Sequence, residues 1–134
     1  MDASPASAIL IVDDDRDNAE IVRQLLEARG YLVAVAYDGD AALATFETLR
    51  PALVLLDVVM PGRSGWEVCR VMKQHPEHGR NVRIIMLTAL SAWDEKQAAL
   101  QTGADDYITK PLDLHDLVRR VERNIALVGH TTSG

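Results

Sequence analysis

The chain has 134 residues, which is the size of one ordinary domain. Fourteen lysines and arginines against twenty aspartates and glutamates give a formal charge of −6, which argues against direct binding to nucleic acid or to an anionic membrane surface. One cysteine excludes an internal disulfide, and no apolar run is long enough to cross a bilayer. With acidic Asp2 where a signal peptide would be basic, these features predict a cytoplasmic protein.

Five apolar runs alternate with longer amphipathic stretches, which is typical of an α/β domain with a parallel sheet. The first run is continuously apolar, as a strand covered by helices on both faces should be. The expected strands are residues 8–12, 31–36, 53–56, 82–87 and 107–108. Apolar residues at helical spacing predict five helices, with stripes in residues 21–26, 41–49, 66–72, 92–100 and 114–125.

Breaker residues mark where several of these helices end. Gly30 follows the first stripe, Pro51 the second and Gly103 the fourth. Small and polar residues make up both ends of the chain, so we expect a flexible leader at residues 1–7 and a flexible tail at residues 129–134. The folded domain is expected to span residues 8–128.

Polar side chains follow the ends of the expected strands. Asp13 and Asp14 come after the first strand, Asp57 after the third, Thr88 after the fourth and Lys110 after the fifth. Ligands of open parallel sheets bind beyond the carboxyl ends of the strands. Three carboxylates at one edge repel one another unless a hard divalent cation lies between them. Ligands that are all oxygen favour Mg²⁺, with Mn²⁺ as a substitute.

Four motifs stand in a fixed order on these elements. They are Ile-Leu-Ile-Val-Asp-Asp-Asp at 9–15, Leu-Leu-Asp-Val-Val-Met-Pro-Gly-Arg-Ser-Gly at 55–65, Leu-Thr-Ala at 87–89 and Gly-Ala-Asp-Asp-Tyr-Ile-Thr-Lys-Pro at 103–111. In this order they resemble the CheY-like receiver domains of two-component response regulators. The resemblance implies a flavodoxin-like, doubly wound five-stranded parallel sheet of order 2-1-3-4-5 with five helices.

The resemblance also implies roles for the acids. Asp57 would be the phosphoacceptor, taking a phosphoryl group from a sensor histidine kinase or a phosphotransfer protein. Asp13 and Asp14 would hold Mg²⁺ together with Asp57 and the backbone carbonyl of Val59. Lys110 would neutralise the transferring oxygens, so no separate acid or base is needed. Such a domain is a signalling switch that assists only its own phosphorylation and dephosphorylation, and not an enzyme.

A second set of residues is implied in switching. Thr88 would bind the phosphoryl group, beside the small Ala89, and the ring of Tyr107 would turn inward when the hydroxyl moves. Lys110 and Pro111 match the place of the family's cis peptide. The surface formed by the fourth helix, fifth strand and fifth helix would then change and signal to an effector or output domain.

Two aliphatic residues depart from the polar side chains that often flank the phosphoryl group in the family. They are Val59, two residues after Asp57, and Leu90, two residues after Thr88. Neither side chain can orient an attacking water, so we hypothesise slow dephosphorylation. Ser64 stands where the family often has aspartate, which affects a turn more than the chemistry.

A charge pattern on the last helices resembles the symmetric dimers of receivers in the winged-helix transcription-factor subfamily. Charged residues would pair between copies around an apolar centre, although exposed charges usually only solvate a surface. The residues are Lys96, Leu100, Asp105, Asp106, Asp116, Val118 and Arg120.

Other interpretations compete with the receiver. A phosphatase or mutase could use Asp13 as its nucleophile. Enzymes of that class, however, have Thr or Val at the position of Asp17, and they usually carry a cap domain. A degenerate receiver acting as a scaffold is disfavoured because every expected pocket residue is present. Asp15 is expected to cap a helix, Cys69 to pack in the core, and the histidines at 75 and 78 to be solvated loop residues.

Overall fold

A computed structural model of the protein describes residues 7–89 and 103–131. Five parallel strands form one sheet in the order β2-β1-β3-β4-β5, which confirms the expected topology. The strands are β1 (Ala8–Val12), β2 (Leu32–Ala36), β3 (Leu53–Asp57), β4 (Arg83–Thr88) and β5 (Asp106–Thr109). The described helices are α1 (Arg16–Glu27), α2 (Gly39–Leu49), α3 (Gly65–Lys73) and α5 (Leu114–Thr131). The helix expected at 92–100 lies outside the described residues.

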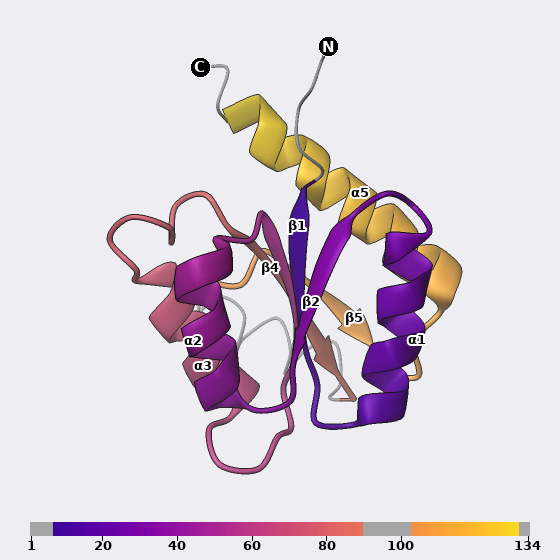
Figure 1. Cartoon of the computed structure of the whole chain (residues 1–134), viewed down its shortest axis with the longest axis horizontal. Coiled ribbons are helices and arrows are strands. Elements are labelled where there is room, and N and C mark those ends of the chain that lie inside the picture. Colours follow the sequence, from indigo (N-terminus) through magenta and orange to yellow (C-terminus); the bar gives the residue numbers. More distant parts are fainter. Residues whose placement is uncertain (1–6, 90–102, 132–134) are drawn as a thin grey trace.

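Helices cover both faces of the sheet, with α1 and α5 on one side and α2 and α3 on the other (Figure 1). Successive residues of a strand point to opposite faces, so Ile9 and Ile11 pack in one cluster and Leu10 and Val12 in another. All four side chains are at most 1% exposed. Burial on both faces is the reason that this strand is apolar throughout.

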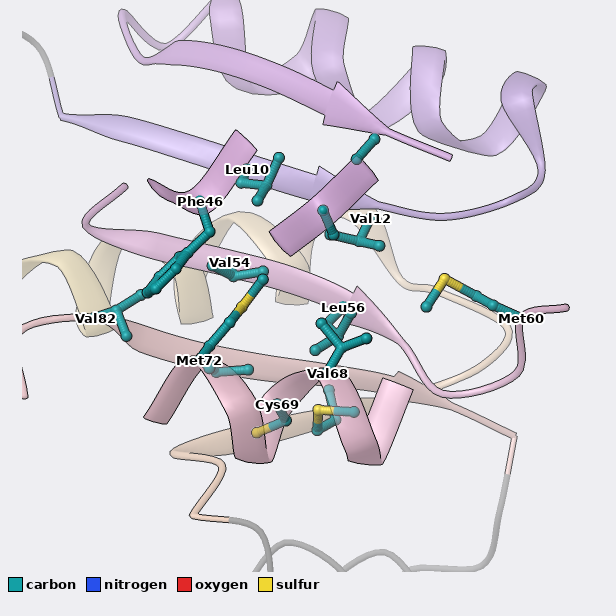
Figure 2. Close-up of a cluster of buried hydrophobic side chains, with 14 of the residues drawn as sticks. Leu10, Val12, Phe46, Val54, Leu56, Met60, Val68, Cys69, Met72 and Val82 are labelled. Atoms are coloured by element: carbon teal, nitrogen blue, oxygen red, sulfur yellow. The ribbon is translucent and has the colours of Figure 1, made fainter. Parts of the chain in front are cut away.

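The cluster under α2 and α3 contains Phe46, Cys69 and Met72, as Figure 2 shows. Cys69 and Met72 are fully buried, which confirms their expected role in packing. Truncating a side chain such as Met72 to alanine in a core of this kind typically costs about 2–5 kcal/mol of stability. These two clusters therefore hold the strand ends in place.

Short polar side chains cap the N-termini of all four described helices, with Asp113 capping α5 through the N–H groups of His115 and Asp116. Asp15 accepts hydrogen bonds from the backbone N–H groups of Asp17 (3.0 Å) and Asn18 (3.1 Å) at the start of α1. Asp38 caps α2 and Ser64 caps α3 in the same way. Each cap contributes about 1 kcal/mol and fixes the point where the chain leaves the sheet edge.

The last helix, α5, continues to Thr131, past the expected domain end at 128. Within the described ranges, no helix combines the length and the apolar character needed to cross a membrane.

Candidate functional site

Three acids meet at the carboxyl end of the sheet. Strands β1 and β3 are neighbours with Val12 opposite Leu56, so Asp13 and Asp57, which follow directly, come side by side. Both are 3% exposed, whereas Asp14 is exposed. Each of the three acids offers a carboxylate oxygen, and these oxygens lie within 4.8 Å of one another. The sheet thus gathers acids that are more than forty residues apart in the sequence.

Asp57 lies at the centre of this cluster. The Nζ of Lys110 donates to its Oδ2 at 3.0 Å, and the N–H of Val59 donates to its Oδ1 at 3.2 Å. Lys110 reaches it because its own N–H bonds to the carbonyl of Thr88 at 2.8 Å, which ties the end of β5 to β4. Asp57 is therefore a buried carboxylate with one ammonium group in contact.

The electrostatics of the cluster act on Asp13. Burial, with the charge of Asp57 and a hydrogen bond between the two carboxyl groups, raises the pKa of Asp13 from 3.8 to about 6. The N–H of Asp15, which donates to its Oδ1 at 2.9 Å, and the charge of Lys110 oppose the rise in pKa. The raised pKa of Asp13 indicates that its carboxylate has too little positive charge nearby to stabilise it.

The donor set fits a hard divalent cation. Three carboxyl groups, those of Asp13, Asp14 and Asp57, meet only one ammonium group, that of Lys110, so acids outnumber bases at the site. Oxygen donors close together at a sheet edge suit Mg²⁺ or Mn²⁺ better than zinc.

The residues expected to switch surround the same edge. Thr88, at the end of β4, is 1% exposed, and Ala89 beside it is exposed. Tyr107 is partly buried and packs against the cluster under α2 and α3. The peptide bond between Lys110 and Pro111 is cis, as the resemblance implied. Leu90 lies outside the described residues.

The loop after β3 is held close to Asp57. The N–H of Gly65 donates to the carbonyl of Val58 at 2.9 Å. A Cβ on Gly65 would lie 2.1 Å from the carbonyl oxygen of Asp57, so only glycine fits there. Met60 is 8% exposed and is directed back toward the cluster that contains Val12 (Figure 2).

The charges proposed for a dimer have partners within the chain. Arg120 donates to Asp106 at 2.8 Å, to Asp116 at 3.0 Å and to the carbonyl of Tyr107 at 3.0 Å. Asp105 pairs with Lys73 at 2.7 Å. Arg120, Asp105, Asp106 and Asp116 are therefore already paired within one chain.

The apolar centre of that dimer face also differs from the expectation. Val118 is 5% exposed and belongs to the interior, because α5 turns this side of the helix toward the rest of the chain. The other two residues proposed for the face, Lys96 and Leu100, lie outside the described residues. Val118 also belongs to the apolar stripe that spacing predicts over residues 114–125, and its burial agrees with that stripe and not with an exposed dimer face.

A second cluster joins Glu47, His75 and His78, one ligand atom of each lying within 4.8 Å of the others. The Nδ1 of His75 accepts from the N–H groups of Glu77 and His78, both at 3.1 Å, so its Nε2 carries the proton and donates to Glu47 at 2.7 Å. The rings of His75 and His78 are stacked, with centroids 4.3 Å apart. One metal ion cannot lie in the planes of two stacked rings.

His75 therefore organises its own loop through Nδ1, and its stacking on His78 disfavours a single metal ion held by both rings. Its side chain is 14% exposed, which corrects the expectation of a solvated loop residue. The signal in the sequence was the spacing of two histidines three residues apart beside a proline, which alone does not distinguish a cap from a solvated side chain.

Comparisons with known proteins agree with the fold and with the acidic cluster at the carboxyl end of the sheet. The family model for the response regulator receiver domain matches residues 9–122. The structure is similar to a receiver domain of a signal transduction histidine kinase from Syntrophus aciditrophicus, with 36% identity, a TM-score of 0.82, and 90% of this chain and 91% of that chain covered. It is also similar to a CheY-like receiver domain protein from Methanospirillum hungatei, with 30% identity, a TM-score of 0.84, and 94% and 98% covered. The chain belongs to the response regulator receiver domain family.

Proposed function

We propose that Asp57 accepts a phosphoryl group from the phosphohistidine of a sensor histidine kinase or phosphotransfer protein in a Mg²⁺-dependent reaction in the cytoplasm. The observation that carries this proposal is the buried Asp57 carboxylate, with Lys110 at 3.0 Å and two further acids beside it. The P–N bond of the donor breaks as the bond from phosphorus to an Asp57 oxygen forms, and the imidazole keeps the electron pair.

The residues of the chain divide the work of this reaction. Asp13, Asp14, Asp57 and the carbonyl of Val59 would hold the metal, which when bound neutralises charge on the phosphoryl oxygens. Lys110 supplies a second positive charge at Oδ2 of Asp57. Burial of Asp57 limits access of water to the acceptor.

After transfer, the new charge acts on β4 and β5. The hydroxyl of Thr88 would bind a phosphoryl oxygen, with Ala89 leaving room for the group, and Tyr107 would turn into the space that the hydroxyl leaves. The surface on β5 and α5 would thereby change and signal to an effector or output domain.

Incubation with acetyl phosphate and Mg²⁺ tests the function. We expect the intact mass to rise by one phosphoryl group, mapped to Asp57, and the gain to vanish in EDTA. Asp57→Asn should remove the gain and keep the fold, which circular dichroism checks. Steady release of phosphate through a modified Asp13 would instead support the phosphatase, and a protein that gains no mass with any donor would be a scaffold.

A groove beside Lys110 offers a docking place for the protein donor. It has a volume of about 300 Å³ and is lined by Asn18, Ile21, Val22, Lys110, Pro111, Leu112 and Leu114. Ile21 is 53% exposed and Leu114 is 40% exposed, so the groove has an apolar rim. A protein that brings its phosphohistidine to Asp57 must contact this edge of the sheet.

Ile21→Asp should therefore slow phosphorylation by a protein donor without slowing phosphorylation by a small-molecule donor. We expect phosphorylation by acetyl phosphate to keep its rate, and transfer from a phosphorylated kinase to slow by about tenfold or more, because an apolar contact in a docking surface is lost. Leu32→Asp is the matched control, since Leu32 is 59% exposed at the opposite end of the sheet. Equal slowing by both variants would contradict docking in this groove.

The lifetime of the phosphorylated protein is expected to be long. Val59 is 73% exposed, and its aliphatic side chain cannot orient a water toward Asp57. We expect Val59→Asn combined with Leu90→Asn to speed loss of phosphate, measured on the purified phosphoprotein. A lifetime of seconds that does not change in the double variant would refute this expectation.

A further inference from the structure

The loop of residues 58–64 places two backbone groups of Val59 at the site. Its N–H donates to Asp57, and its carbonyl is the one expected to reach the metal. The base of the loop is fixed, because the N–H of Val58 bonds to the carbonyl of Leu87 at 3.0 Å and Gly65 bonds to Val58. What holds the outer part of the loop therefore bears on the orientation of Val59.

Arg63 joins this outer part to two helices. Its Nε donates to Asp40 at 2.8 Å, in the first turn of α2, and its Nη1 donates to Glu67 at 2.7 Å, in the first turn of α3. The planar guanidinium fixes the directions of both bonds at once. Asp40 is 23 residues from Arg63 in the sequence, so the contact links separate parts of the chain.

Gly39, at the start of α2, leaves the space that the side chain of Arg63 occupies. A Cβ on Gly39 would lie 2.9 Å from the Cβ of Arg63 and 2.9 Å from a methyl group of Val68. Any larger residue at position 39 would push the loop away from α2. The contact is therefore steric as well as ionic.

Both ion pairs are largely exposed, the side chains of Arg63 and Glu67 being 41% and 42% exposed and that of Asp40 84%. Exposed pairs add little to global stability because water screens them. Their effect is local, because they restrict the exposed outer part of the loop, residues 61–64, whereas Met60 already anchors the part next to Val59 in the core.

We propose that Arg63 is a positioning residue, which through Asp40 and Glu67 holds the backbone of Val59 in the orientation that the metal and the acceptor require. The metal part of this inference rests on the proposed function. The arrangement makes the start of α2 part of the support of the phosphorylation site.

The experiment compares Arg63→Ala with Arg23→Ala. Arg23 also joins two carboxylates, those of Glu20 and Glu27, at the surface of α1, so it matches the chemistry away from the loop. Amide hydrogen exchange in EDTA and Mg²⁺ titration by calorimetry are measured on both. For Arg63→Ala we expect faster exchange at Val59 and a Mg²⁺ Kd raised by about 3- to 10-fold, within what two exposed ion pairs can supply.

Arg63→Ala and Asp40→Ala should be non-additive in Mg²⁺ affinity, because they remove the same contact. The thermal midpoint in EDTA should match that of Arg23→Ala, which a merely structural role of Arg63 would not give. Unchanged exchange at Val59 in Arg63→Ala, or an equal loss of Mg²⁺ affinity in Arg23→Ala, would overturn the proposal. If the wild-type chain bound no Mg²⁺, the proposed function would fail, and exchange at Val59 alone would decide the role of Arg63.

Discussion

Replacing Gly65 by alanine is expected to lower the free energy of unfolding by roughly 2–4 kcal/mol, because the new Cβ would meet the carbonyl oxygen of Asp57 at 2.1 Å and the Cα of Val58 at 2.8 Å. Alanine favours a helix over glycine by about 0.5–1 kcal/mol, which offsets only part of this loss. Both atoms in the way belong to the backbone, so relief requires α3 to move away from β3. Asp57, at the end of β3, would be displaced from α3 by the same movement.

Gly62→Ala is the matched control in the same loop. Gly62 has a φ of +79°, but a Cβ there meets nothing within 4 Å, so its cost is backbone strain of about 1 kcal/mol. Urea unfolding of both variants measures the difference, and acetyl phosphate labelling of Asp57 measures the effect on the site. A loss in Gly65→Ala no larger than that in Gly62→Ala would show that the approach of α3 to β3 is not tight.

The metal-free protein should lose stability as the pH rises, on account of Asp13. Its pKa is raised to about 6 in the folded chain, so the folded state binds the proton more tightly than the unfolded state. The contribution of protonated Asp13 to the free energy of unfolding is complete below about pH 4 and is lost as the pH rises through 6. A shift of about 2 pKa units corresponds to roughly 2–3 kcal/mol.

Asp13→Asn removes this titration and keeps an oxygen to accept from Asp15. In EDTA at pH 8, we expect the variant to unfold with a free energy roughly 1–2 kcal/mol higher than the wild type, because repulsion with Asp57 is relieved. At pH 4 the advantage should vanish, and excess Mg²⁺ should reverse it by stabilising only the wild type strongly. Glu77→Gln, at an exposed acid, is the control. A variant less stable than wild type at pH 8 in EDTA would contradict this account.

Features of the site that depend on strand order follow from the sequence. Continuous apolar runs mark buried strands, and the carboxyl ends of parallel neighbours share one edge. Asp13, Asp57 and Lys110 could therefore be placed together before any coordinates were known. The cap at Asp15 was equally local, since it depends on backbone N–H groups two and three residues away.

Contacts between side chains on different elements did not follow from the sequence. Asn124, 1% exposed on α5, accepts from Arg83 and donates to Asp106, yet in the sequence it is one polar residue in an amphipathic helix. The pairing of Arg120 with Asp106 likewise depends on how α5 is rotated against the sheet.

By itself, the amino-acid sequence determined the alternation of elements, the family and the acids at the sheet edge, because these depend on periodicity along the chain and on the rule that parallel strands end together. Only the tertiary structure decided that His75 caps its own loop, that Arg63 reaches Asp40 and that Gly65 touches Asp57. Those contacts depend on the distance between helices and on side-chain direction. Periodicity in one segment carries no information about either.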